Sequence, residues 1–536
     1  MRKKVFILLS IISLGLGLRL FILASRGSLW FDEAFSAHFA ALDVGQMLHY
    51  LRFENNPPLY FILLHFWIKL FGNSELALRL PSIIFGVASI PMIYILGKRL
   101  HSSTAGLFAS FLLAISSFQV FYSVETRMYS LYLFLTLLAT WLFWRNQEPK
   151  KKCHSEKPQA TKNPILKITG SIRSLRSLRM TFNALIPYSL FLILLLLIWT
   201  HITAWLIILA FIFFLLIQCK FKIKAFLIYN RKFLLIIALL IASFSPWIIN
   251  FIKLKIISPL SSGYFFYLPP QKNYFLDILE TFLVFGQDNA FIVTLLSILI
   301  VVLLYFSLAA TGWWSGFRRG LPDAVIFLLS WLFLPLFIGF AFSNSIMRYF
   351  IAVAPAFYLL LGIGFAQLLE KYKNTQIIFL RWAMPLLFFI LIIPDYPSIA
   401  LASHHQWDKL AQWIEGMQNA ECRMQNKCLV LINPHSEILP FERYYKGALP
   451  FIGLYPKDDR DDRDMRIVKT NWLSLNTKEN IRRLADLTQN FNRVFLVTGG
   501  TDPTGQNLVP IWFWQNNWRL TEEKQFGRQS VIFLAK

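Results

Sequence analysis

The chain has 536 residues, of which 56% are hydrophobic and only 15% are charged, and its formal net charge is +24. Hydrophobic runs of about 20 residues recur as far as Pro394, which excludes a soluble globular protein and indicates a polytopic membrane protein. The charge argues against nucleic-acid binding, because basic residues concentrate in a few loops and the part after Pro394 is almost neutral, with 18 Lys/Arg against 16 Asp/Glu.

Eleven segments before Pro394 are predicted to cross the membrane as helices, since each has about the length that spans a bilayer core. They are residues 5–25, 81–98, 104–120, 128–144, 184–200, 203–219, 232–250, 289–309, 324–342, 347–368 and 376–394. Because the first segment is one of many, we expect it to be a membrane helix and not a cleaved signal peptide. The predicted fold is therefore mainly α, a transmembrane bundle over residues 1–394.

Basic residues mark every second connection between these spans. They precede the first span and follow the second, fourth, sixth, eighth and tenth, and the longest of these connections, residues 145–179, holds ten Lys/Arg and two acids. Loops rich in Lys and Arg stay on the cytoplasmic side. The pattern predicts a multi-pass protein of the cell membrane with a cytoplasmic N-terminus and an extracytoplasmic segment after Pro394.

The first external connection, residues 26–80, is long and contains the apolar stretch "PPLYFILLHFWIKLFG" at 57–72. Counting this stretch as a span would turn all later basic loops outward. With His65 and Lys69 inside it, the stretch is predicted to be a helix in the membrane interface. A first surface helix is expected to begin near Asp32 and to end by the Asn-Asn-Pro-Pro sequence at 55–58.

The segment 395–536 is predicted to be a small extracytoplasmic α/β domain. Short apolar runs, "CLVLINP" and "RVFLVTGG", alternate with the helical pattern "TKENIRRLADLTQNF". The glycines of "VTGGTDPTG" at 497–505 are too sparse for a nucleotide-binding motif and indicate a loop. Cys422 and Cys428 either form a disulfide in an oxidising compartment or remain free thiols, and the spacing does not decide between them.

The predicted topology collects a set of polar and aromatic side chains on the outer face. Its members are Asp32, Glu33, Glu125, Arg127, Tyr129, His201, Arg348 and Tyr349. Each has an ordinary structural explanation. Asp32 could cap a helix, Glu125 and Arg127 could form an interfacial ion pair, and Arg348 could extend to the interface. His201 could be a loop residue, and the tyrosines could belong to the aromatic belt.

Taken together, the set has the chemistry for group transfer from a lipid phosphate. A carboxylate can accept the proton of an acceptor hydroxyl. An arginine can hold the departing phosphate through charge-assisted bidentate contacts, and an apolar groove between spans can hold a lipid tail. This chemistry does not require a metal or another cofactor, although the acidic cluster could hold a divalent cation.

Four stretches in order resemble bacterial membrane glycosyltransferases of the GT-C fold, and in particular the family 39 type, which includes protein O-mannosyltransferases and the aminoarabinose transferases of lipid A. They are "LWFDEAFS", "NNPPLYFILLHFWIKLFGNSELALRLPS", "YSVETRMYSLYLF" and "MRYFIAVAPAFYLLLGIG", and the resemblance covers about residues 5–370. It implies a sugar donor on a polyprenyl phosphate, an extracytoplasmic active site and inversion at the anomeric carbon.

The resemblance also implies roles for individual residues. Asp32 matches the acidic residue of the first external loop, the expected general base, and Glu33 belongs to the same motif. Glu125 matches the acid of the second external loop. Arg348, with Arg127 and Tyr349, is expected at the donor phosphate. The candidate substrate contacts are His201, where relatives often have a Thr-His pair, Tyr129, and Asn56, which stands where some relatives have Lys before the Pro-Pro sequence.

Two other kinds of protein remain open from the sequence. A lipid-linked glycan polymerase or ligase would use a lipid diphosphate donor from the same side of the membrane. A flippase or transporter would favour ionisable residues near the middle of the membrane, whereas most of those found here lie at the ends of spans. The sugar is undetermined, and a protein, a lipid A core, a wall polymer or another glycolipid would each fit as the acceptor.

Overall fold

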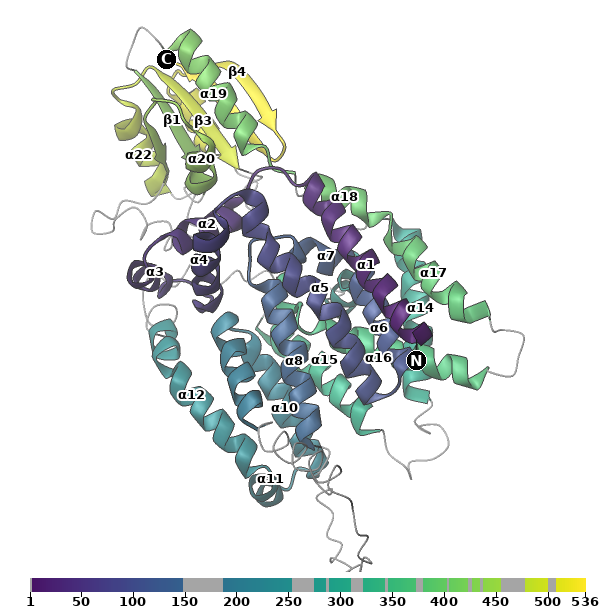
Figure 1. Cartoon of the computed structure of the whole chain (residues 1–536). Coiled ribbons are helices and arrows are strands. Elements are labelled where there is room, and N and C mark those ends of the chain that lie inside the picture. The colour runs from purple at the N-terminus through teal and green to yellow at the C-terminus, as the bar shows by residue number, and fades with distance from the viewer. Residues whose placement is uncertain are drawn as a thin grey trace, which may run out of the picture.

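The computed structural model describes residues 2–147, 187–252, 274–285, 289–309, 322–342, 346–372, 379–402, 404–422, 427–433, 437–454, 478–499 and 508–536. Most of the basic connection predicted at 145–179 and of the glycine-containing loop at 497–505 lies outside these residues. The chain forms a large helical bundle with a small α/β domain at one end, next to α2 and α4 (Figure 1).

Helices occupy the positions of all eleven predicted spans. They are α1 (Arg2–Ser25), α5 (Glu75–Leu100), α6 (Ser103–Ile115) with α7 (Ser117–Ser123), α8 (Tyr129–Gln147), a helix at Pro187–Thr200, α10 (Ala204–Gln218) with α11 (Ile223–Tyr229), α12 (Arg231–Ile252), α14 (Ala290–Ala309), α15 (Asp323–Ala341), α16 (Ala354–Lys371) and α17 (Leu380–Ile392), with α13 (Tyr274–Thr281) between α12 and α14.

Fewer helices than the predicted eleven are long and apolar enough to count as membrane spans. Within the described ranges, six helices are long and apolar enough to cross a membrane, or up to eight if each bent pair is one span. The prediction of eleven also counted the short helix at 187–200, and it counted α8 and α16, which have polar or charged residues at their ends. The chain is a multi-pass membrane protein by either number.

The first external connection forms three helices, α2 (Phe31–Ala41), α3 (Val44–Leu51) and α4 (Leu59–Phe71). The expected single helix from Asp32 to residue 55 is wrong, because Leu42 and Asp43 have extended backbone and divide it in two. Helix α4 has 13 residues, or about 20 Å at 1.5 Å per residue. It is too short to cross a bilayer core of about 30 Å, in agreement with the prediction that it does not span.

A bend brings the segment between α7 and α8, residues 124–128, to the site. Helices α6 and α7 meet at 61°, and the break falls at Ser116, whose hydroxyl accepts a hydrogen bond from the backbone N–H of Gln119. Because α7 ends at Ser123, the segment that carries Glu125 and Arg127 begins directly after the bend. The Ser82 hydroxyl of α5 donates to the carbonyl of Arg127 at 3.1 Å and holds this segment in place.

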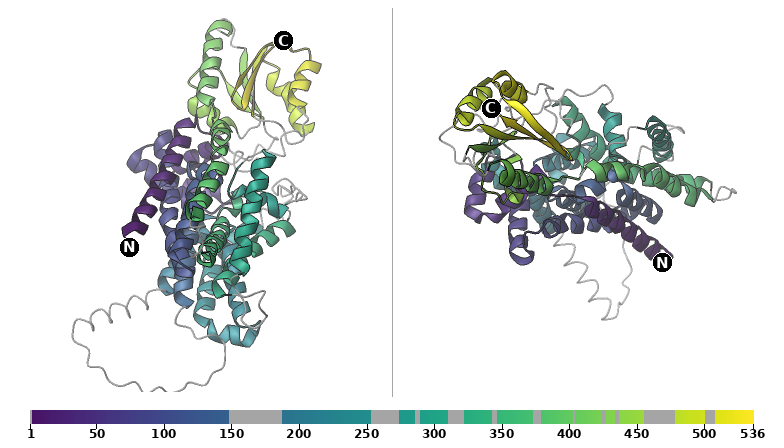
Figure 2. Two further views of the ribbon diagram at one scale, coloured as in Figure 1. Left: turned by 90° about the vertical axis from the view of Figure 1, so that its right-hand side faces the viewer. Right: turned by 90° about the horizontal axis from the view of Figure 1, so that it is seen from above.

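The C-terminal part has one five-stranded sheet in the order β2-β1-β3-β5-β4. Its strands are β1 (Cys428–Asn433), β2 (Phe451–Gly453), β3 (Arg493–Gly499), β4 (Arg519–Phe526) and β5 (Gln529–Ala535). Strand β1 is parallel to β2 and β3, and β5 is antiparallel to β3 and β4. The accompanying helices are α19 (Trp407–Glu421), α20 (Ile438–Tyr444), α22 (Lys478–Thr488) and α23 (Leu508–Gln515). Helix α18 (Asp395–Ala402) belongs to the bundle, since it continues the apolar stretch Arg381–Leu401 of α17 and packs against α1 and α7. Figure 2 shows this domain projecting from one end of the bundle.

The structure decides the pairing of two cysteines that the sequence left open. Cys422 and Cys428 form a disulfide, with their Cα atoms 6.1 Å apart. The predicted fold class is confirmed, since the chain is mostly helical, with apolar membrane helices and a small C-terminal α/β sheet.

Candidate active site

Asp32 lies in the first turn of α2, but its side chain does not cap the helix. The residue at the N-cap is Trp30, and no side chain accepts a capping hydrogen bond there. The carboxylate Oδ2 of Asp32 instead accepts a hydrogen bond from Nη1 of Arg348 at 3.0 Å, and it is 3.9 Å from Nε of Arg127. Two arginines from distant parts of the chain therefore face the expected general base.

These two arginines differ in burial and position. Arg127 is almost fully buried between α7 and α8, where its Nη1 donates to the Ser36 hydroxyl at 3.4 Å. Arg348 lies in the 3-10 helix η3 (Met347–Phe350) before α16, and 28% of its side chain is exposed. Burial opposes the charge of both guanidinium groups, but neighbouring groups that include Asp32 outweigh it and raise the pKa of both arginines. Both remain cationic.

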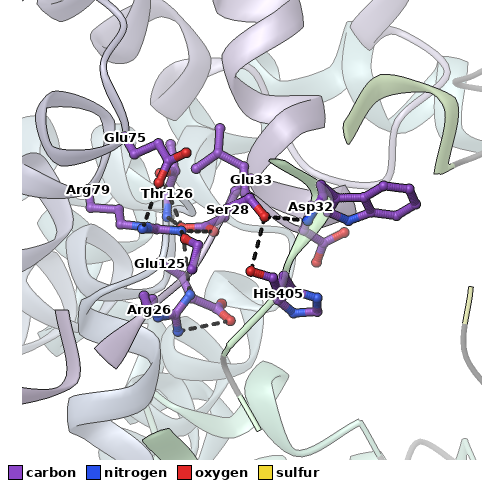
Figure 3. Close-up of polar contacts among 12 residues, drawn as sticks. Arg26, Ser28, Asp32, Glu33, Glu75, Arg79, Glu125, Thr126 and His405 are labelled. Atoms are coloured by element: carbon purple, nitrogen blue, oxygen red, sulfur yellow. Dashed lines mark hydrogen bonds and ion pairs between the residues drawn. The ribbon is translucent and has the colours of Figure 1, made fainter. Parts of the chain in front are cut away.

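Glu33 points away from Asp32 into a fully buried cluster of ion pairs (Figure 3). Arg79 of α5 donates to both carboxylate oxygens, at 2.9 and 2.8 Å. Arg26 is 3.6 Å away, and the backbone N–H of Thr126 donates at 3.1 Å. Burial alone would raise the pKa of Glu33, but Arg79, Arg26 and Thr126 lower it to about 2. Glu33 therefore stays charged and links α2 to α5 and to the segment between α7 and α8.

Glu125 is buried beside the same cluster with incomplete partners. Its Oε1 is 3.5 Å from Nη2 of Arg26, whereas no hydrogen-bond partner for its Oε2 occurs among the described residues. Burial raises the pKa of Glu125 to about 7, because Arg26 only partly offsets it and the nearby acids Glu33 and Asp32 add to it. A buried carboxyl that titrates near neutrality is common at functional sites.

The aromatic candidates gather on the other side of the arginines. His201 stacks on Tyr132 with the ring centroids 4.8 Å apart, and its ring is edge-on to Tyr349 at 5.4 Å. The backbone N–H of Thr203 donates to Nδ1 of His201 at 3.2 Å, so the proton of the neutral ring lies on Nε2. Burial and the two site arginines lower the pKa of His201 to about 3, which keeps the ring neutral.

Two buried donors of this aromatic group have no protein partner. The Nε2 of His201 and the hydroxyl of Tyr129 make no hydrogen bond to any residue that the structure describes. Their rings lie 6.0 Å apart. Buried donors without partners are costly, so a bound group that accepts hydrogen bonds would stabilise this region.

Asn56 lies at the edge of the site. Its amide donates to the carboxylate of Glu54 at 3.2 Å. Glu54 is close enough for its charge to act on Arg127 and Tyr349. The structure thus brings Asn56 into the neighbourhood of the arginines but shows no contact between its side chain and theirs.

The structure adds site residues that the sequence analysis missed. Arg26 and Arg79 organise both glutamates, and the acid Glu437 lies in the C-terminal part close to Asp32. Arg79 lies within the motif "NSELALRLPS", and Arg26 comes six residues before Asp32. Their proximity to the predicted site motifs is the signal that could have identified them. Nothing in the sequence around Glu437 distinguishes it from a surface acid.

An apolar cavity of about 420 Å³ opens beside the aromatic group. It lies between α10 and α12 and begins one residue after His201. Its lining residues are Ile202, Trp205, Ile241, Phe244, Trp247 and Ile248. A cavity with only apolar and aromatic walls suits a hydrocarbon chain.

The residues present do not form a metal site of the usual kind. Nowhere in the part of the chain that the structure describes do three or more His, Cys, Asp or Glu side chains gather as metal ligands would. At the site, Asp32, Glu33 and Glu125 each face an arginine. The arginines beside these acids could bind an anionic group, and the acids are already paired with them.

The chain is similar to known membrane glycosyltransferases in sequence and in fold. The model of the dolichyl-phosphate-mannose-protein mannosyltransferase family matches residues 55–153. No curated protein matches the sequence.

Among solved structures, the fold is similar to that of ArnT from Cupriavidus metallidurans in the apo state, with a TM-score of 0.55, 13% identity, and coverage of 98% of this chain and 97% of that one. ArnT bound to undecaprenyl phosphate gives a TM-score of 0.54 with the same identity and coverage. The archaeal oligosaccharyltransferase AglB from Archaeoglobus fulgidus, in complex with an inhibitory peptide and a dolichol-phosphate, gives 0.51 with 15% identity over 95% of this chain and 72% of that one. The predicted resemblance to the GT-C fold is confirmed.

Proposed function

We propose that the protein is an integral membrane glycosyltransferase that moves a sugar from a polyprenyl phosphate to an acceptor hydroxyl, with inversion at the anomeric carbon. The observation that supports this most directly is the position of Asp32 between two arginines, at 3.0 Å from Arg348 and 3.9 Å from Arg127. A base beside two cations is what transfer away from a phosphate requires.

The proposed reaction has one step. The acceptor hydroxyl loses its proton to Asp32, and its oxygen forms a bond to the anomeric carbon. The bond from that carbon to the phosphate oxygen breaks, and its electron pair stays on the phosphate. Arg348 and Arg127 stabilise the charge that develops on this leaving group. Two guanidinium groups match the charge of one departing phosphate, which favours a monophosphate donor over a lipid diphosphate.

Donor binding also explains the present pairing of Asp32. An arriving phosphate would compete with Asp32 for Arg348, whose side chain is the more exposed of the two arginines. Once Arg348 turns to the phosphate, the carboxylate of Asp32 loses one hydrogen-bond donor and is open to the acceptor hydroxyl. The base would thus become active only after the donor has bound.

The apolar cavity between α10 and α12 is the proposed place for the first part of the lipid tail. It begins next to His201, whose buried Nε2–H has no hydrogen-bond partner within the described ranges. A lipid phosphate there would reach the arginines with its head and the cavity with its chain. Two proteins of similar fold were solved with lipid phosphates, ArnT with undecaprenyl phosphate and AglB with a dolichol-phosphate, which supports this choice of donor.

We infer an extracytoplasmic position for the site and for the α/β domain. The distribution of basic loops favours this orientation. The disulfide between Cys422 and Cys428 agrees with it, since disulfides persist in oxidising compartments.

The function is tested by transfer from labelled polyprenyl-phosphate sugars to a detergent extract of bacterial envelope, with purified wild type and the Asp32→Asn variant. We expect label to leave the lipid with the wild type only. Release from lipid-diphosphate glycans alone would move the protein to the polymerase or ligase class. Movement of lipid-linked sugar across a vesicle membrane without transfer would identify a flippase instead.

A further inference from the structure

The C-terminal domain is docked directly onto the segment that leads into α2. Ser28 is the centre of this contact, because its backbone N–H and its hydroxyl both donate to the carbonyl of His405 at 3.0 Å. Figure 3 shows Ser28 against His405. The hydroxyl of Ser28 also accepts a hydrogen bond from the backbone N–H of Trp407 at 2.6 Å. A Cβ atom at Gly27 would lie 1.9 Å from the His405 carbonyl oxygen, so only glycine permits this approach.

Helix α20 of that domain packs against α2. The hydroxyl of Tyr444 accepts a hydrogen bond from the backbone N–H of Leu29 at 2.8 Å, and Tyr444 also bonds to Glu75 at the start of α5. Because Tyr444 is the last residue of α20, these contacts fix the C-terminal end of that helix relative to the segment that leads into α2. The domain is therefore part of the wall of the site.

Glu437 immediately precedes α20 and turns into this wall. Only 5% of the residue is exposed, and its Oε2 has no hydrogen-bond partner in the described parts of the chain. Burial and the charge of Asp32 raise the pKa of Glu437 to about 8, so its carboxyl group is mostly protonated at neutral pH. Unlike Asp32, Glu33 and Glu125, it has no ion pair with an arginine among the described residues.

A cavity lies between the same two helices, α2 and α20, although neither Asp32 nor Glu437 is among its lining residues. It has a volume of about 240 Å³, and its walls include the polar residues His38, Asn73, Glu442 and Arg443. The contact between the domain and the bundle is therefore not closed along its whole length.

We propose that Glu437 binds the acceptor, and that the acceptor is a carbohydrate with a second hydroxyl next to the one that Asp32 deprotonates. The Oε2 of Glu437, which has no hydrogen-bond partner among the described residues, would donate its O–H to the second oxygen and hold the first over Asp32. Each hydroxyl of a sugar can both donate and accept a hydrogen bond. One hydroxyl can therefore donate to the carboxylate of Asp32 while its neighbour accepts from the protonated carboxyl of Glu437. This inference rests on the proposed transferase function and gives the C-terminal domain a role in acceptor choice.

The test compares wild type, Glu437→Ala and Glu437→Gln in one labelled-donor assay with two acceptors. The first acceptor is the glycolipid fraction of a bacterial envelope extract. The second is water, which yields free labelled sugar and needs the donor site and Asp32 only. We expect Glu437→Ala to raise the glycolipid KM at least tenfold while release to water stays within twofold. The Gln variant, which keeps an N–H donor and the shape of the side chain, should recover most of the loss.

Several outcomes would overturn the inference. Unchanged glycolipid transfer by Glu437→Ala would remove Glu437 from the acceptor site, and an equal loss with both acceptors would mark it as structural. Transfer to a Ser/Thr peptide, and not to glycolipid, would overturn the carbohydrate class. If wild type neither transfers nor releases label, the proposed function fails with it, whereas an active wild type with an indifferent Glu437 confines the failure to this inference. Glu523→Ala, an exposed acid on β4, is the matched control.

Discussion

Asp32 and Arg348 are 316 residues apart in the chain, yet Nη1 of Arg348 donates to Oδ2 of Asp32 at 3.0 Å. One residue lies in the first turn of α2 and the other in η3, just before α16. The pair therefore forms only when the connection between α1 and α5 has folded over the end of the bundle where α16 begins. The candidate site is a product of the whole bundle and not of one local motif.

Asp32→Asn should abolish most transfer without loss of the fold. The amide keeps the size of the side chain but cannot take the acceptor proton, and a general base contributes about 10²–10⁴-fold to a rate. We expect kcat to fall by at least 10²-fold in the labelled-donor assay. Asp43→Asn is the matched control, because Asp43 is exposed at the start of α3. A loss below tenfold for Asp32→Asn would contradict the role of base.

Arg348→Ala should weaken use of the donor. It removes one of two cations at the proposed phosphate position, so we expect a higher donor KM and a lower kcat, with kcat/KM reduced about 10²-fold or more. Arg348→Lys should recover only part of the loss, since an ammonium cannot make a bidentate contact. Arg519→Ala on the exposed edge of β4 serves as control. A donor KM and a kcat equal to wild type would place Arg348 outside the site.

Glu33 should behave as a structural residue although it adjoins Asp32. Loss of one partner from a buried ion pair costs about 3–5 kcal/mol of unfolding free energy. Glu33→Gln and Arg79→Met are therefore each expected to lower thermal stability strongly. The double variant should lose less stability than the sum of the two single losses, because both changes break the same ion pair. Thermal unfolding in detergent measures all three variants. Additive effects would show that the bidentate contact between Arg79 and Glu33 contributes little.

The sequence predicted the central residues because their motifs lie at the outer ends of spans. Asp32, Arg127 and Arg348 were identified in this way, and the structure brings them together. Arg26 and Arg79 were missed, since a basic residue near the end of a span also fits ordinary interfacial placement. Their roles depend on which acids face them across three helices, and this is a property of packing.

Other features could not be read from local pattern. The division between α2 and α3 depends on extended backbone at Leu42 and Asp43, where no proline or glycine marks a break. Glu437 becomes part of the site only because a separate domain docks onto Ser28 and Leu29. Neither the division of the helix nor the docking of the domain produces a periodicity or a residue spacing that can be recognised in the sequence.

Glu125 should make stability depend on pH near neutrality. Its pKa is about 7 in the fold and 4.5 ordinarily, so the folded state holds a proton that the unfolded state releases. Stability is then lost as pH rises from about 4.5 through 7. Because one pKa unit is about 1.4 kcal/mol, the loss is on the order of 1–3 kcal/mol. Glu125→Gln lacks this titration, so the melting temperature of wild type should fall relative to the variant between pH 5 and pH 8. A constant difference across this range would refute the shift.

A larger side chain in the apolar cavity should impair long-chain donors selectively. Ile248 lines the cavity between α10 and α12, and Ile248→Trp would occupy space that we assign to the lipid tail. We expect a several-fold higher KM for a full-length polyprenyl-phosphate sugar, while a short-chain isoprenyl analogue, which does not fill the cavity, should keep its KM. Leu239→Trp is the control, since Leu239 is on the same helix and 48% exposed. Equal effects of Ile248→Trp on both donors would place the tail elsewhere, because a cavity that holds the chain must distinguish donors by chain length.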